Sequence, residues 1–143
     1  MPTESEDPSD IRSIAVTAED VVTAAETNRT SDRTAVLRVT PPFSGRMRAR
    51  LHVRLHDDPQ EAGAIHIPPT DLFAGSAPEY PRPAATEDDL RSDPDLEYSV
   101  ERHREHHEQA VEEWRVAAAD AIADSVTLSA GKGTHEVTVH VLG

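Results

Sequence analysis

The chain has 143 residues, with 27 acidic and 14 basic side chains and a formal net charge of −13. It has no cysteine, which excludes disulfides, cysteine-ligated zinc, iron–sulfur clusters and thiol nucleophiles. No apolar run approaches the roughly 20 residues of a membrane-spanning helix, and residues 1–10 lack the basic start and apolar core of a signal peptide. We therefore expect a soluble, cytoplasmic protein.

The basic residues are almost all arginine, because Lys132 is the one lysine among the 14 basic side chains. At molar salt the Debye length falls to about 3 Å, so repulsion between surface acids costs little. An acid-rich and lysine-poor composition is therefore typical of a salt-accumulating halophile. The alternative is an ordinary acidic protein with an acidic tail. In a halophilic chain a local basic cluster is more informative than the general acidity.

The first 30 residues predict a tail, a strand and a helix. Residues 1–10 contain four acids, two prolines and no base, which predicts a disordered acidic tail. Residues 11–16 predict a short strand. Thr17 then stands where a helix N-cap is expected, and the helix should end near Asn28.

Residues 35–56 predict two strands. The first, over 35–40, ends at Pro41-Pro42 because proline cannot donate to a sheet hydrogen bond. Residues 46–56 show the clearest alternation in the chain, which predicts one long strand with a buried and an exposed face. Apolar side chains form the buried face: Met47, Ala49, Leu51, Val53 and Leu55. Basic side chains form the exposed face: Arg46, Arg48, Arg50, His52, Arg54 and His56.

The exposed face of this strand is the first candidate site. Side chains two residues apart on a strand are separated by roughly 6.6 to 6.8 Å, which is close to the phosphate repeat of an extended single strand. Guanidinium groups also form forked bonds to oxyanions. The pattern predicts an anion-binding strip for nucleic acid, a nucleotide or an acidic protein. The alternative is a solvated face that pairs with acids in 57–100, where the net charge is −9, or with Glu136.

The second half of the chain predicts three more strands, over 64–67, 126–128 and 134–142. Residues 75–98 contain four prolines among many acids, which predicts a surface loop with one helical turn near 87–91. Ser99 is the expected N-cap of the longest helix, which should end near Asp124. Six side chains of this helix fall on one apolar arc: Val100, Val111, Trp114, Ala118, Ala121 and Ile122.

This order of elements predicts a single α+β domain over 11–143. We expect a two-layer sandwich in which an antiparallel sheet of five to six strands carries one long and one short helix on one face.

His103 and His107 form the second candidate site. They are four residues apart on the long helix, so both point to the same side, as two ligands of zinc would. Arg104 replaces the glutamate that a His-Glu-x-x-His metalloprotease requires, so a general base is missing. The alternative is a pair of partly buried imidazoles that hydrogen-bond within the fold. A metal site would need a third ligand, for which His66, His135 and His140 are the candidates.

Several runs resemble small haloarchaeal proteins that are grouped only as a domain of unknown function. The similarity lies in residues 15–22, 35–52, 98–114 and 135–137. It implies a halophilic archaeal source and supplies no activity, ligand or catalytic residue.

The sequence favours a non-enzymatic binding or interaction module over an enzyme. It lacks the Gly-x-Ser-x-Gly, Gly-x-Gly-x-x-Gly and Walker patterns. We expect no cofactor and no membrane partner, and an anionic macromolecule or nucleotide as ligand of the arginine strand. A small metal-binding protein or metal-dependent enzyme that uses His103 and His107 with zinc is one alternative. A structural homodimer is another.

Overall fold

The computed structural model describes residues 7–54, 63–130 and 133–142. Within them the chain forms seven strands, three α-helices and two 3-10 helices. The strands are β1 (Ser13–Thr17), β2 (Thr34–Val39), β3 (Arg46–Arg48), β4 (Arg50–Arg54), β5 (Ile65–Ile67), β6 (Ser125–Ala130) and β7 (Gly133–Leu142). The helices are η1 (Pro8–Asp10), α1 (Ala18–Thr30), η2 (Pro69–Leu72), α2 (Pro83–Arg91) and α3 (Val100–Ala119). Of the predicted acidic tail, residues 1–6 lie outside the described residues.

The strands form two sheets, so the α+β class is confirmed but the single antiparallel sheet is wrong. One sheet has the order β3-β1-β7-β6 and the other the order β4-β2-β5. β1 runs parallel to both β3 and β7, whereas the remaining pairs are antiparallel. Strand alternation predicts which face a residue occupies but not which strand pairs with it. Parallel strands need a long connection between them. Such connections are present here, because α1 and β2 separate β1 from β3, and almost the whole chain separates β1 from β7.

The predicted long strand over 46–56 is divided at Ala49 into β3 and β4, which belong to different sheets. Ala49 is fully buried, and its N–H donates to the carbonyl of Ala15 at 3.0 Å. A strand that bends from one sheet into another is a common way to make a corner between two sheets. Residues 55 and 56 of the predicted strand lie outside the described residues.

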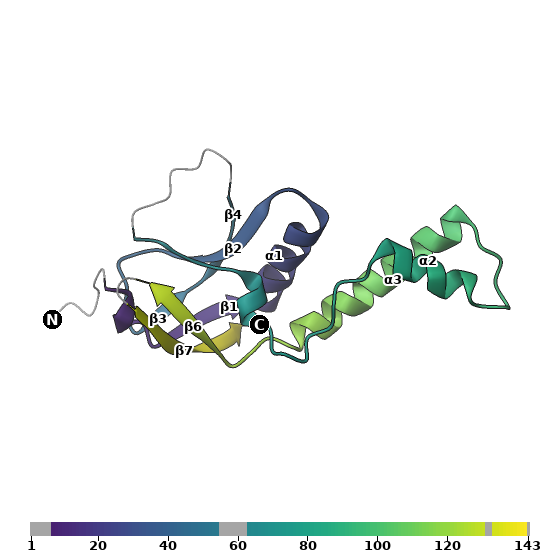
Figure 1. The fold of residues 1–143 in the computed structure, drawn as a ribbon. Helices are drawn as coiled ribbons and strands as arrows, with labels where there is room; N and C mark the ends of the chain where they lie inside the picture. Colours follow the sequence, from purple (N-terminus) through teal and green to yellow (C-terminus); the bar gives the residue numbers. More distant parts are fainter. Residues whose placement is uncertain (1–6, 55–62, 131–132, 143) are drawn as a thin grey trace.

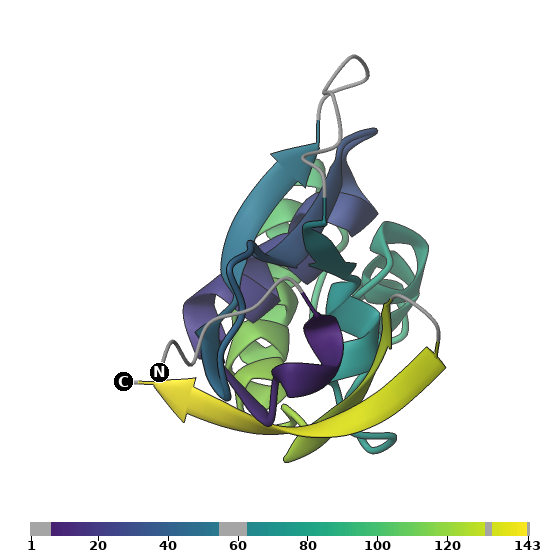
Figure 2. The ribbon, with the colours of Figure 1, turned by 90° about the vertical axis from the view of Figure 1, so that its left-hand side faces the viewer.

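The main core lies between the two sheets and α1. Val21 and Ala24 of α1 pack there with Ile14, Leu37 and other buried side chains of both sheets. The predicted N-cap is confirmed, because the hydroxyl of Thr17 accepts the N–H of Asp20 at 3.1 Å. Viewed from the sheet end, the strands lie in front with α1 and α3 behind them (Figure 2).

Helices α2 and α3 project from the sheets as an arm (Figure 1). The C-terminal part of α3 packs on the rest of the domain, here called the body, through a second apolar cluster. In this cluster Trp114 and Ala118 pack on Val22 and Ala25 of α1. This confirms part of the predicted apolar arc. Val100 is 77% exposed, however, because the N-terminal part of α3 extends beyond the body and contacts α2 instead.

The predicted loop over 75–98 contains a full helix, α2. Pro83 stands at the start of this helix, where its fixed φ angle favours helix formation and its missing N–H is not needed. Thr86 and Leu90 are buried, and α2 packs on α3. The N-cap of α3 is confirmed at Ser99, but the helix ends at Ala119, five residues before the predicted end. None of the helices in the described part of the chain is both long and apolar enough to cross a membrane.

Candidate functional site

The three-stranded sheet gathers basic side chains on its outer face. In the strand register Arg38 lies directly opposite Arg50 on one side and opposite His66 on the other. Residues that face each other across a sheet share a face, and alternate residues of β4 do so too. The basic face is therefore defined by five side chains: Arg38, Arg50, His52, Arg54 and His66. The opposite face of the same strands packs Leu37, Leu51 and Val53 into the core.

Like charges lie next to each other on the basic face. Cβ atoms of directly opposed residues are about 4.5 to 5.5 Å apart, so the Arg38–Arg50 pair is repulsive when no anion lies between the guanidinium groups. β2, β4 and β5 contain no acidic residue. Within the described residues, the side chains of Arg50 and Arg54 form no hydrogen bond or ion pair. These two guanidinium groups are the members of the basic face that can take up a new anion without first losing a partner.

The two histidines of the basic face are neighbours. The ring centroids of His52 and His66 are 5.7 Å apart. Both ring nitrogens of His66 are shielded from solvent and find no hydrogen-bond partner in the described part of the chain. Burial, followed by the positive charges of Arg54, His52 and Arg38, lowers the pKa of His66 below its ordinary value. An anion bound on the basic face would oppose this shift, because it would stabilise the protonated imidazole.

The structure brings together only part of the predicted anion-binding strip. Arg50, His52 and Arg54 share the basic face, whereas Arg46 and Arg48 lie on β3 in the other sheet. The guanidinium of Arg48 donates to the carbonyls of Ala15, at 3.2 Å, and Ala49, at 3.1 Å, so it stabilises the corner between the sheets. Arg46 is exposed. His56 lies outside the described residues.

Sequence reasoning missed two members of the basic face, Arg38 and His66. Each has a local signal, because Arg38 is the one charged residue of β2 and His66 stands between two isoleucines in β5. Which strands they join could not be seen, since the pairing of β2 with β4 and β5 is a long-range contact.

The predicted alternative was that nearby acids neutralise the arginines. Helix α2 lies on the arm, far from β4 (Figure 1), so its acids do not reach Arg50 or Arg54. Glu136 pairs with Thr127 in the four-stranded sheet. The acidic residues of 57–61 lie outside the described residues.

His103 and His107 lie side by side on α3, as their spacing predicts, and face α2. Nε2 of His103 and Nδ1 of His107 each lie 3.0 Å from Oγ1 of Thr86. Nε2 of His103 also lies 3.0 Å from the carbonyl of Pro83. Thr86 is 4% exposed and is the one buried polar side chain among the described residues. The two imidazoles therefore hold the helices of the arm together through hydrogen bonds.

The proposed third metal ligands do not join this histidine pair. His66 lies in the three-stranded sheet, and Nε2 of His135 lies 3.0 Å from the carbonyl of Ile11. No group of three or more His, Asp or Glu side chains among the described residues is placed to hold a metal ion. A zinc site at His103 and His107 stays a prediction, and on this geometry a metal would have to displace the hydroxyl of Thr86.

The chain belongs to a family defined as a domain of unknown function, DUF8009, whose model matches residues 1–143. This confirms the resemblance to a family without an assigned activity. No curated protein and no solved structure shows significant similarity to the chain.

Proposed function

We propose that this DUF8009 protein is a non-enzymatic binding module whose basic face holds an anionic partner. The observation that carries the proposal is the pair Arg50 and Arg54 on β4, whose guanidinium groups form no hydrogen bond or ion pair among the described residues. The strands β2, β4 and β5 contain no acid, so an oxyanion bound to either guanidinium would lie among basic side chains.

The spacing of the basic face suits a partner with several oxyanions. Arg50 and Arg54 are four residues apart on one strand, which separates their side chains by roughly 13 Å, whereas Arg38 lies within about 5 Å of Arg50. A single small anion does not span the roughly 13 Å between Arg50 and Arg54. A row of phosphates or carboxylates does, and each guanidinium can form a forked pair with one of them.

The composition of the face bears on which kind of anionic partner the proposal favours. β2, β4 and β5 contain no Phe, Tyr or Trp, so they offer no large aromatic ring on which an unpaired base could stack. We therefore favour backbone phosphates of a duplex over single-stranded bases, with an acidic protein as the competing outcome of the test.

The proposal is tested by fluorescence anisotropy with three labelled probes: a duplex DNA, a single-stranded DNA and poly-glutamate. The variant is Arg50→Gln/Arg54→Gln, and Arg102→Gln/Arg104→Gln on the arm is the control with the same change in net charge. Arg48 is left intact because its guanidinium supports the corner between the sheets.

We expect the duplex to bind, and the Arg50→Gln/Arg54→Gln variant to bind it at least about tenfold more weakly than the control does. The slope of log K against log salt should also fall by about 2, since two phosphate contacts are lost. Preference for poly-glutamate would assign an acidic protein instead. Equal binding by both variants, or no binding of any probe, would contradict the proposal.

We also propose that the protein is adapted to high salt, which the 27 acids, 14 bases and single lysine support. Under such conditions only direct contacts survive, because a Debye length of about 3 Å removes long-range attraction. The free energy of unfolding should fall when KCl is lowered from about 2 M to 0.1 M, as repulsion among the acids is no longer screened. Urea unfolding followed by circular dichroism measures this, and equal stability at both concentrations would contradict the adaptation.

A further inference from the structure

A pocket of about 530 Å³ lies at the base of the arm and is lined by residues of α1, α3 and η2 and of the segments that follow η2. It is separate from the basic face and shares no residue with it. Trp114 comes from α3, Arg29 from the end of α1, Phe73 from the residue after η2, and Tyr80 and Arg82 from the segment before α2. A volume of this size is within the range of small-molecule sites, which is about 300 to 1,000 Å³.

The aromatic side chains Trp114 and Tyr80 of the pocket are held by contacts with neighbouring residues. Nε1 of Trp114 donates to the carbonyl of Pro78 at 3.1 Å, and the rings of Trp114 and Tyr80 meet edge to face at a centroid distance of 4.8 Å. The hydroxyl of Tyr80 donates to Oε2 of Glu26 at 2.9 Å. The same carboxylate is held by Arg115 at 3.0 Å. The rings are therefore positioned before any ligand arrives.

Tyr80 remains a hydrogen-bond donor at any physiological pH. Burial and the bond to Glu26 raise the pKa of Tyr80 to about 12. The contact with Glu26 uses this hydroxyl, so the ring of Tyr80 contributes its apolar surface to the pocket.

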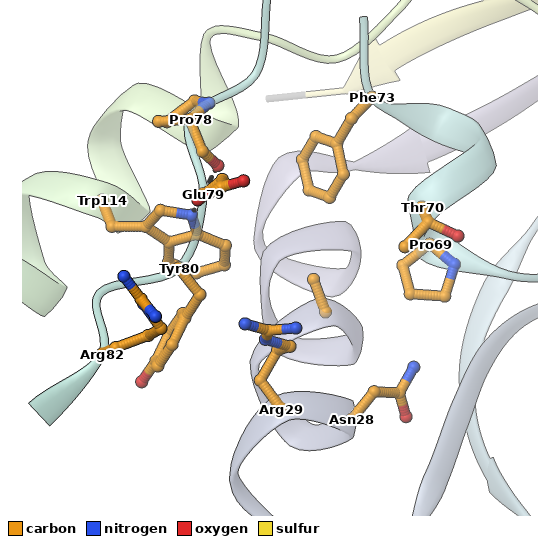
Figure 3. A pocket seen from close by; sticks show the side chains of 11 residues that line it. Asn28, Arg29, Pro69, Thr70, Phe73, Pro78, Glu79, Tyr80, Arg82 and Trp114 are labelled. Carbon is orange, nitrogen blue, oxygen red and sulfur yellow. Dashed lines mark hydrogen bonds between the residues drawn. The ribbon is translucent and has the colours of Figure 1, made fainter. Parts of the chain in front are cut away.

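Two arginines bring positive charge to the same pocket. Among the described residues neither the guanidinium of Arg29 nor that of Arg82 forms a hydrogen bond or ion pair, and both residues are exposed. Glu79 is the one carboxylate in the lining, which leaves an excess of one positive charge. Figure 3 shows the Arg29 guanidinium between the side that carries Trp114 and Tyr80 and the side that carries Phe73 and Pro69. In this chain of net charge −13, a local excess of positive charge runs against the background.

We propose that this pocket binds a small organic anion that carries a planar apolar ring. The ring would lie among Trp114, Tyr80 and Phe73, where aromatic contacts favour offset or edge-to-face arrangements. The anionic group would take forked hydrogen bonds from Arg29 and Arg82. The proposal does not depend on the function of the basic face, since the two sites use different side chains on different elements.

Trp114 makes the proposal directly testable, because it is the one tryptophan of the chain and it lines the pocket. Phenyl phosphate is the probe, with benzyl alcohol as the neutral ring and inorganic phosphate as the ring-free anion. Each is titrated against the full chain while Trp114 fluorescence is recorded, at the lowest KCl concentration at which circular dichroism shows the fold intact. The variant is Arg29→Gln/Arg82→Gln, and Arg102→Gln/Arg104→Gln, at two positions outside the pocket lining, is the control with the same change in charge.

We expect a saturable fluorescence change with phenyl phosphate and binding at least about tenfold weaker in Arg29→Gln/Arg82→Gln, because charge-assisted bonds are lost. The control should bind phenyl phosphate as the unmodified chain does. Absence of saturation up to about 10 mM would overturn the proposal. If benzyl alcohol bound as tightly as phenyl phosphate, the role of the anionic group would be refuted. If inorganic phosphate bound as tightly as phenyl phosphate, the role of the ring would be refuted. Unchanged binding in the Arg29→Gln/Arg82→Gln variant, with circular dichroism as the check on folding, would also overturn it.

Discussion

Replacing Thr86 by valine should destabilise the arm without creating a cavity. Valine keeps the shape of the side chain but removes the hydroxyl, which lies 3.0 Å from each of the two histidine nitrogens and 3.1 Å from the carbonyl of Pro83. His103 would keep the carbonyl of Pro83 at 3.0 Å, whereas Nδ1 of His107 would lose the one partner found for it among the described residues. One lost hydrogen bond with a half-buried nitrogen left unpaired costs about 1 to 2 kcal/mol.

Urea unfolding followed by circular dichroism measures the overall effect. Hydrogen exchange over residues 83–107 measures the local effect on the arm. Thr23→Val is the matched control, because Thr23 is exposed on α1, and this change should stay within about 0.5 kcal/mol.

A double-mutant cycle separates the hydrogen bond from any change in packing. If the bond to His107 is the cause, Thr86→Val/His107→Leu should be less destabilised than the sum of the two single variants, by about 1 kcal/mol. Additive effects, or a Thr86→Val variant as stable as the Thr23→Val control, would refute the assignment of Thr86 as the link between the helices.

Two further predictions concern single residues of the body. The pKa of His66 is lowered from its ordinary value of 6.5, so the neutral imidazole stabilises the fold above that pH, and this contribution should be lost as the pH falls below about 6.5. Calorimetry should therefore show a smaller acid destabilisation in His66→Gln than in the unmodified chain, and equal destabilisation in the two would contradict this. Asn28→Ala should lower the free energy of unfolding by about 1 to 2 kcal/mol, because the side-chain amide of Asn28 accepts the N–H of Ala35 at 2.6 Å and donates to the carbonyl of Ala35 at 2.9 Å. Urea unfolding measures this change. An Asn28→Asp variant, which keeps only the acceptor, should have a stability between those of the unmodified chain and the Asn28→Ala variant.

The features that could be predicted from the sequence are those set by nearby residues. Thr17 and Ser99 were correctly predicted as N-caps, because a cap depends on a side chain and the backbone two or three residues away. Three of the six positions on the predicted apolar arc of α3, Val111, Trp114 and Ala118, are buried, since helical periodicity is also a local property.

The features that were wrong or missed depend on contacts between distant segments. Alternation over 46–56 gave no sign of a sheet change at Ala49, because each half of the strand alternates equally well. Val100 fits the apolar arc, but whether the body extends far enough to cover it is not a property of α3. Long-range pairing also explains why the basic face was predicted only in part. Arg50 and Arg54 could be predicted from the alternation within one strand, whereas Arg38 and His66 join them only through strand pairing.

The length of α3 between the pocket and the far end of the arm has a geometric consequence. From Trp114 to Val100 the helix covers 14 residues, or about 21 Å at 1.5 Å per residue. The N-terminal part of α3 packs on α2, while Trp114 and Ala118 in its C-terminal part pack on the body. If α3 turned about Trp114 as a rigid rod, a change of about 5° in its angle would move its N-terminal end by about 2 Å. The pocket lies at this held end of α3, beside Trp114, so a change in the angle of the helix there would be amplified along the arm.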